Sequence, residues 1–77
     1  HHITRSNGRG VIVMEKFTKD FKLHRPPEDG PAYIRRSDNG VVLAELFNVN
    51  GKPHRPTGDG PAYTARNGDG VVIVQGF

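Results

Sequence analysis

The sequence predicts an all-β fold, an antiparallel meander of β-hairpins with little or no helix. Three observations support this prediction. Four-residue apolar runs follow Gly10, Gly40 and Gly70, and each of these glycines closes a short turn rich in Asn, Asp, Ser or Gly. No stretch shows an apolar period of 3.6 residues that is long enough for a helix. Glycine and proline are abundant, with 10 and 6 occurrences in 77 residues, which favours turn-rich structure.

An internal repeat with a spacing of 30 residues runs through the chain. Residues 24–33 and 54–63 are identical at eight of ten positions, a similarity too high for chance in so short a chain. The position of Phe17 recurs at Phe47 and Phe77. We therefore expect one small domain over residues 1–77, about two and a half repeats long, with units at about 3–17, 24–47 and 54–77. His1 and His2 resemble the remnant of an expression tag.

Each repeat predicts one hairpin whose first strand is short, at residues 3–5, 32–36 and 62–66. The second strand begins after the glycine and is apolar on both faces there, which indicates self-association or a strongly coiled sheet. Asn50-Gly51 predicts a second tight turn, with the chain folding back through residues 52–55. The first repeat has residues 18–21 instead, so we expect a looser connection there. Any helix is expected to be about one turn near residues 17–23.

Composition excludes several classes of protein and site. The chain has no cysteine and therefore no disulfide and no thiolate metal site. Its apolar runs are too short to cross a bilayer, so we expect no membrane insertion, and a cytoplasmic location. The net charge of +3 comes from basic residues spread along the chain, which is only a weak indication of an anionic partner.

The second repeat unit carries a motif with a known counterpart. Residues 47–55 read Phe-Asn-Val-Asn-Gly-Lys-Pro-His-Arg, and Asp59-Gly60-Pro61-Ala62 follow. This pattern resembles the Asn-Gly-Lys, His-Arg, Asp-Gly-Pro-Ala hairpin repeats of bacterial and phage proteins, which are similar to MORN repeats. The resemblance covers roughly residues 15–77 and implies tandem hairpins in a single-layered sheet. It also implies a scaffold without catalytic activity that serves protein association and sometimes lipid contact. The period of 30 departs from the low twenties of MORN repeats.

The repeated histidines allow two interpretations. His24 and His54 can share a divalent metal if Asp29 and Asp59 complete the ligand set. Alternatively, each histidine packs against the next hairpin or hydrogen-bonds a turn carbonyl, while each neighbouring arginine pairs with an aspartate. We favour the second interpretation, in which the segment is the corner between hairpins, and expect neither a metal nor a cofactor. The corner residues are His24, Arg25, Asp29, Gly30, Pro31, His54, Arg55, Asp59, Gly60 and Pro61.

No catalytic constellation is evident, and we expect the chain not to be an enzyme. Glu15 and Glu45 are equivalent positions, but Gln75 interrupts the series, which suits a repeated surface position better than a carboxylate pair. The hydroxyls of Thr57, Tyr33 and Tyr63 have no consistent base nearby. The glycine-rich turns precede strands rather than helices and lack the Lys-Ser/Thr of a phosphate-binding loop.

The remaining candidates are binding residues. Arginines recur at the hairpin tips, where they can form a basic stripe, and tyrosines stand beside them. Such a stripe suits single-stranded nucleic acid, whereas the tyrosines alone suit the packing of a sheet face. The candidates are Arg35, Arg36, Arg66, Tyr33, Tyr63 and Phe47, with Arg5 and Arg9 extending the stripe and Phe17 and Phe77 the packing face.

The function predicted from these features is non-enzymatic binding. A sheet face or edge is expected to contact a protein partner, with self-association included. A terminal strand near Ile3 or Phe77 invites the addition of a partner's strand. The alternative is a basic module that binds nucleic acid through its arginine tips.

Overall fold

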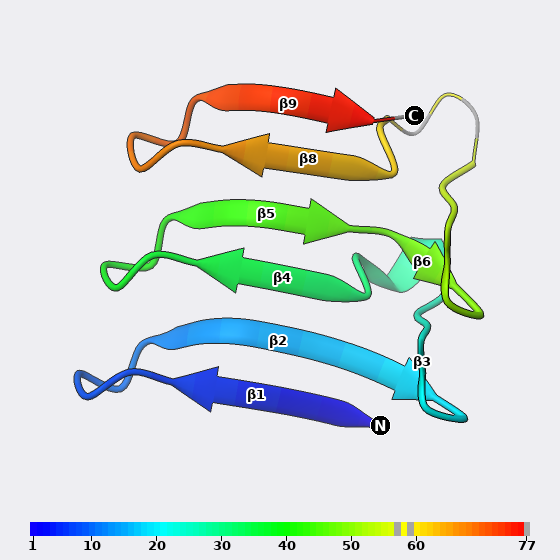
Figure 1. Cartoon of the computed structure of the whole chain (residues 1–77), viewed down its shortest axis with the longest axis horizontal. Coiled ribbons are helices and arrows are strands. Elements are labelled where there is room, and N and C mark those ends of the chain that lie inside the picture. Colours follow the sequence, from blue (N-terminus) through cyan, green and yellow to red (C-terminus); the bar gives the residue numbers. More distant parts are fainter. Residues whose placement is uncertain (57, 59, 77) are drawn as a thin grey trace.

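The computed structural model describes residues 1–56, 58 and 60–76, and it is all-β. Three long hairpins lie side by side in one antiparallel sheet (Figure 1), with the strand order β1-β2-β4-β5-β8-β9. The predicted fold class is therefore confirmed. The hairpins comprise β1 (His2–Ser6) with β2 (Ile12–Lys19), β4 (Tyr33–Arg36) with β5 (Val42–Leu46), and β8 (Tyr63–Arg66) with β9 (Val72–Gly76).

Each long hairpin closes with the same turn chemistry. The backbone N–H of Gly10 donates to the carbonyl of Asn7, and the Asn7 side chain accepts from the N–H groups of Arg9 and Val11. Gly10 has a φ of 81°, in the left-handed region that glycine enters without strain. Its counterparts 30 and 60 residues later have φ values of 91° and 82°. The glycines that mark the sequence period are thus required by the turns.

Two short hairpins lie at the opposite ends of the long strands. In the first, β3 (Lys22–Leu23) pairs with the end of β2, and in the second, β6 (Asn48–Val49) pairs with β7 (Lys52–Pro53). The predicted Asn50-Gly51 turn is present, with φ values of 52° and 82°. The prediction of a looser first connection is wrong, because Asp20 and Phe21 adopt the same conformation, with φ values of 52° and 66°.

Residues 17–23, the place expected for any helical turn, contain none. Those residues continue β2 and then pair in the short hairpin, because strand pairing satisfies their backbone groups. Among the described residues, helical geometry occurs only in the 3-10 turn η1 (Pro27–Asp29), which lies in the segment joining β3 to β4. A proline-rich stretch suits such a short turn, since proline fixes φ near the helical value.

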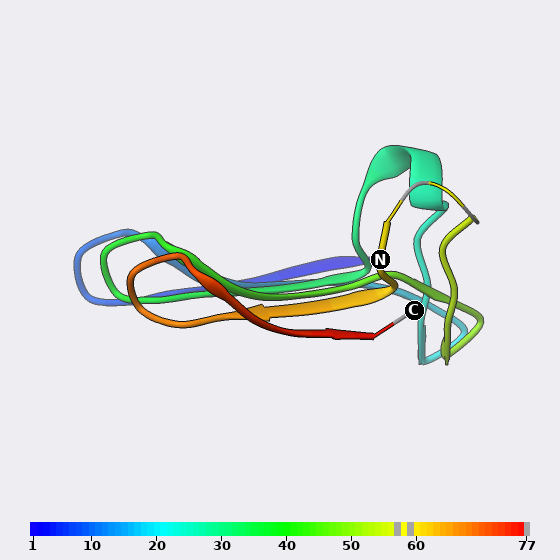
Figure 2. The ribbon, with the colours of Figure 1, turned by 90° about the horizontal axis from the view of Figure 1, so that it is seen from above.

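The molecule measures 34 × 28 × 16 Å, and its sheet is a single layer. The segments that join one long hairpin to the next, here called connectors, gather at one end of the sheet (Figure 2). The interior is correspondingly small, because no second sheet or helix in the described part of the chain covers the strands along their length. Among the described residues the buried ones are Ala32, Phe47, Asn48, Ala62 and Thr64, mostly near the connectors. The apolar residues of β9 remain exposed, with Ile73 at 60% and Val74 at 50%.

Strand alternation and register define two faces of the sheet. We call the face on which the connectors pack the connector face, and the other the open face. The connector face carries His2, Thr4, Glu15, Phe17, Ile34, Arg36, Glu45, Phe47, Thr64, Arg66 and Gln75. The open face carries Ile3, Arg5, Met14, Lys16, Tyr33, Arg35, Ala44, Leu46, Tyr63, Ala65 and Val74.

Candidate functional site

The connectors are held to the sheet by arginine stacked on phenylalanine. The guanidinium carbon of Arg25 lies 3.8 Å from the centre of the Phe17 ring, and that of Arg55 lies 4.0 Å from the centre of the Phe47 ring. A cation over an aromatic face at this distance is attracted by the ring quadrupole. Phe47 is only 7% exposed, so the structure places this predicted binding residue in the interior, under the connector.

The same arginines also hold the Gly-Pro corner. Arg25 donates to the carbonyl of Pro31 at 3.4 Å, and Arg55 donates to the carbonyl of Pro61 at 3.2 Å. A Cβ placed on Gly60 would lie only 3.0 Å from the Arg55 guanidinium, so the glycine allows this close approach. The repeated motif therefore forms a structural clamp, with arginine between the ring and the corner.

The predicted pairing of arginine with aspartate is wrong for the first corner. Arg25 directs its guanidinium to Phe17 and Pro31, and no ion pair joins it to Asp29 in the described part of the chain. Stacking on the ring keeps the guanidinium in the gap between sheet and corner, away from the exposed Asp29 in η1. Asp59, the expected partner of Arg55, lies outside the described residues, as do Thr57 and Phe77.

The histidines take structural positions. His24 Nδ1 accepts a hydrogen bond from the backbone N–H of Asn50 at 3.1 Å, which joins the first corner to the tight turn of the next repeat. The backbone N–H of His54 donates to the carbonyl of Phe47, and that of His24 to Phe17. Across the part of the chain that the structure describes, no three His, Asp or Glu side chains gather as metal ligands.

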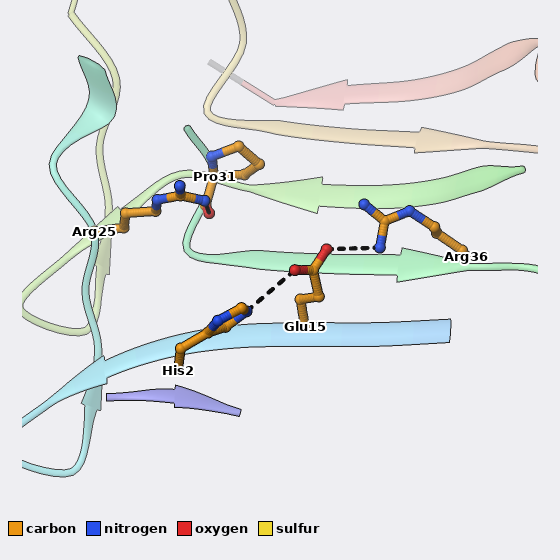
Figure 3. Close-up of polar contacts among 5 residues, drawn as sticks. All are labelled: His2, Glu15, Arg25, Pro31 and Arg36. Carbon is orange, nitrogen blue, oxygen red and sulfur yellow. Dashed lines mark hydrogen bonds and ion pairs between the residues drawn. The ribbon is translucent and has the colours of Figure 1, made fainter. Parts of the chain in front are cut away.

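The two repeated glutamates each pair with an arginine of the next hairpin (Figure 3 shows the first pair). Arg36 Nη1 lies 2.7 Å from Glu15 Oε2, and Arg66 Nη1 lies 2.5 Å from Glu45 Oε1. Glu15 also contacts His2 Nε2 at 3.1 Å. The hydrogen bond from Arg36 lowers the pKa of the Glu15 carboxyl below 4.5, although partial burial opposes this effect. Both carboxylates therefore join hairpins instead of facing each other.

The arginines predicted to form one stripe lie on opposite faces of the sheet. Arg36 and Arg66 lie on the connector face in their ion pairs, whereas Arg5 and Arg35 lie on the open face and are exposed. Adjacent side chains of a strand point to opposite faces, so strand alternation alone could have predicted that Arg35 and Arg36 lie on different faces.

The open face carries a smaller basic group. Arg5 and Arg35 flank Met14 across three strands, and Lys16 lies opposite Tyr33. These residues line a shallow groove together with Asp38 of the neighbouring turn. Tyr63 lies on the same face, two strands beyond Tyr33, with Leu46 between them. Among the described strand residues, this face bears cations and aromatic rings but no carboxylate.

The most exposed apolar surface of the described strands is the open edge at β9. Its counterparts β2 and β5 each have a neighbouring strand along both edges, whereas among the described strands β9 pairs only with β8. Gln75 presents its backbone N–H and C=O to the free side, since its counterpart Glu45 points toward β8 from β5. The sequence analysis indicated a terminal strand near Phe77 as a site of strand addition but did not single out Ile73, Val74 or Gln75, although the change from Glu to Gln at position 75 marks this strand as different.

Comparison with protein-family models, curated proteins and solved structures finds no match for this chain. No helix in the described ranges has the length and apolar character needed to cross a membrane. The candidate functional features are therefore the open edge of β9, the two faces of the sheet and the connectors.

Proposed function

We propose that the chain is a non-enzymatic binding module of the MORN-like hairpin-repeat type, which binds an extended segment of a protein partner along β9. The observation that supports this is the open edge of β9. Val72, Ile73 and Val74 are 43%, 60% and 50% exposed. They lie in a strand with one open edge, whereas its counterparts β2 and β5 pair with a neighbouring strand along both edges. Unpaired backbone groups beside apolar side chains are what strand addition uses: the backbone supplies affinity and the side chains supply selectivity.

Ion pairing supports a binding module over an enzyme. Glu15 and Glu45, the equivalent carboxylates, are each engaged by a guanidinium of the neighbouring hairpin. A general acid or base needs a proton affinity near the working pH, but Arg36 moves the pKa of Glu15 away from neutrality. The two carboxylates therefore stabilise the sheet by joining neighbouring hairpins.

A labelled peptide with the sequence of residues 30–37 tests the proposal, because it contains β4, the strand that pairs with β2 inside the chain. Fluorescence anisotropy should show saturable binding, and amide hydrogen exchange should slow at Gln75. Gln75→Pro removes the outward N–H, at an edge position where proline is tolerated, and should abolish binding. Gln75→Ala keeps the N–H and should bind. Equal binding by the proline variant, or none by the wild type, would reject the proposal.

A second candidate is binding of single-stranded nucleic acid on the open face. It is supported by Arg5, Lys16 and Arg35, which lie on one face beside Tyr33, in an arrangement that suits phosphates and stacked bases. An oligothymidine at low salt should then bind with an affinity that falls as salt rises, and Arg35→Ala should reduce the slope. Arg66→Ala, on the other face, is the matched control. No binding at low salt would exclude this candidate.

A further inference from the structure

Two interfaces between hairpins inside the chain have one and the same register. Between β2 and β4, Met14 lies opposite Arg35, and between β5 and β8, Ala44 lies opposite Ala65. Both members of the second pair lie 30 residues after those of the first. The sheet therefore contains a joint that is used twice, and each use joins the second strand of one hairpin to the first strand of the next.

At each edge of the sheet lies a strand that corresponds to one member of this joint but has no partner strand among the described residues. β9 is the counterpart of β2 and β5, and β1 is the counterpart of β4 and β8. The two strands lie at opposite edges in Figure 1. Phe47 donates its backbone N–H to Ala62, so Ala62, and Thr64 two residues later, point toward β5. Thr4 is the counterpart of Thr64 and points outward from β1, as Gln75 does from β9.

We infer that the segment received by β9 is β1 of a second copy of this chain, joined head to tail in the register of the internal joints. Val74 would then lie opposite Arg5 of the second copy, Gln75 opposite Thr4, and Gly76 opposite Ile3. This inference rests on the proposed function, since it requires that β9 accepts a strand, and it names the partner.

The charges at the two edges support a joint between copies. At each internal joint a glutamate of one hairpin meets an arginine of the next, as Glu15 meets Arg36. At the proposed joint the corresponding positions hold Gln75 and Ser6, so both charges are missing together. A glutamate facing Ser6, or an arginine facing Gln75, would be left in the joint without its partner, which costs free energy.

The turns support the same register. The Asn7 side chain donates from Nδ2 to the carbonyl of Asp38 at 3.0 Å, which links the turns of the first two long hairpins. Asn67 is the counterpart of Asn7, and its Oδ1 likewise accepts from two backbone N–H groups of its own turn. Its Nδ2 is therefore oriented to donate to the carbonyl of Gly8 in the second copy, the counterpart of Asp38.

A head-to-tail joint uses different surfaces on its two members, so it leaves a free β1 and a free β9 and does not close. This property separates it from a symmetric joint of β9 with β9. Sedimentation velocity of the wild type should show a mass that rises with concentration through dimers and longer species. A chain that stays monomeric at millimolar concentration would overturn the inference.

Complementary blocking of the edges gives the decisive test. Thr4→Pro closes the β1 edge and leaves β9 free, whereas Gln75→Pro closes β9 and leaves β1 free. Each variant alone should be monomeric, and their mixture should form a 1:1 dimer that grows no further. Thr4→Ala and Gln75→Ala keep their N–H groups and should associate like the wild type. Dimers of Thr4→Pro alone, or a mixture that stays monomeric, would contradict the inference.

A charge pair tests the register without proline. Ser6→Arg and Gln75→Glu together rebuild the internal ion pair at the joint, so the double variant should associate up to about fivefold more tightly than the wild type, as expected for a partly exposed pair. Each single variant should associate more weakly than the wild type. Equal effects of the single and double variants would reject this register. If β9 binds the peptide of residues 30–37 but the chain does not self-associate, this inference fails and the proposed function stands.

Discussion

The clamp of Arg55 on Phe47 predicts a large effect of one substitution on stability. Arg55→Ala removes the guanidinium that lies 4.0 Å from the ring centre and its 3.2 Å hydrogen bond to Pro61. A partly exposed cation over a ring contributes about 1 kcal/mol. A hydrogen bond from a charged donor contributes about 1.5 kcal/mol, which partial exposure reduces to about 1. We therefore expect the free energy of unfolding to fall by about 2 kcal/mol.

Urea unfolding followed by circular dichroism measures this change. The Gln75→Pro background is used so that self-association does not contribute to the measured stability. A loss of about 2 kcal/mol corresponds to a melting temperature lower by roughly 10 °C in a domain of this size. Arg55→Lys keeps the charge but loses the planar stack, so it should cost about half as much.

Arg35→Ala is the matched control, because Arg35 is exposed on the open face and lies outside the clamp. It should change the free energy of unfolding by less than about 0.5 kcal/mol. If Arg55→Ala is no more destabilising than Arg35→Ala, the clamp does not hold the connector. If Arg55→Lys matches the wild type, the positive charge alone is sufficient and stacking is unimportant.

Three further predictions follow from local geometry. Gly30→Ala should lower the free energy of unfolding by about 1–3 kcal/mol in the urea assay, because Gly30 has a φ of 123° and an added Cβ would lie 3.2 Å from Arg25; an unchanged midpoint would contradict this. Phe21→Gly should raise the melting temperature, with a gain of about 1 kcal/mol, because the exposed Phe21 has a φ of 66°; a lower melting temperature would show that its ring contributes contacts. Because Arg36 lowers the pKa of Glu15, the contribution of that carboxylate is complete above its ordinary value of 4.5 and is lost as the pH falls through the lowered pKa. The loss of stability below about pH 4.5 should therefore be smaller in Glu15→Gln, and an identical pH profile for this variant and the wild type would refute the coupling.

Most of the fold followed from local patterns. A residue with positive φ in a tight turn is recognisable from Gly, Asn or Asp, so the hairpin tips and the Asn50-Gly51 turn were predictable. The turn at Asp20 and Phe21 was missed because Phe21 lacks that signature and takes the left-handed conformation only because β2 and β3 pair around it. Pairing contributes more free energy there than the strain of two residues costs.

The candidate site was less accessible to prediction. That Arg35 and Arg36 lie on opposite faces follows from strand alternation alone and was available in the sequence. The pairing of Arg36 with Glu15 depends instead on which strands are neighbours and in what register, which no local pattern specifies. The stack of Arg25 on Phe17 likewise depends on how the connector crosses the end of the sheet.

The sequence by itself therefore determined the all-β class and the hairpin turns, because positive φ and strand alternation depend on each residue and its immediate neighbours. Only the tertiary structure decided which partners the charged side chains have and which backbone groups of the terminal strands point outward. Those features arise between residues far apart in the chain, such as Glu15 and Arg36, which are 21 positions apart. The unpaired side of β9 is a property of its place in the sheet, because similar apolar runs in β2 and β5 are covered by the hairpin that follows.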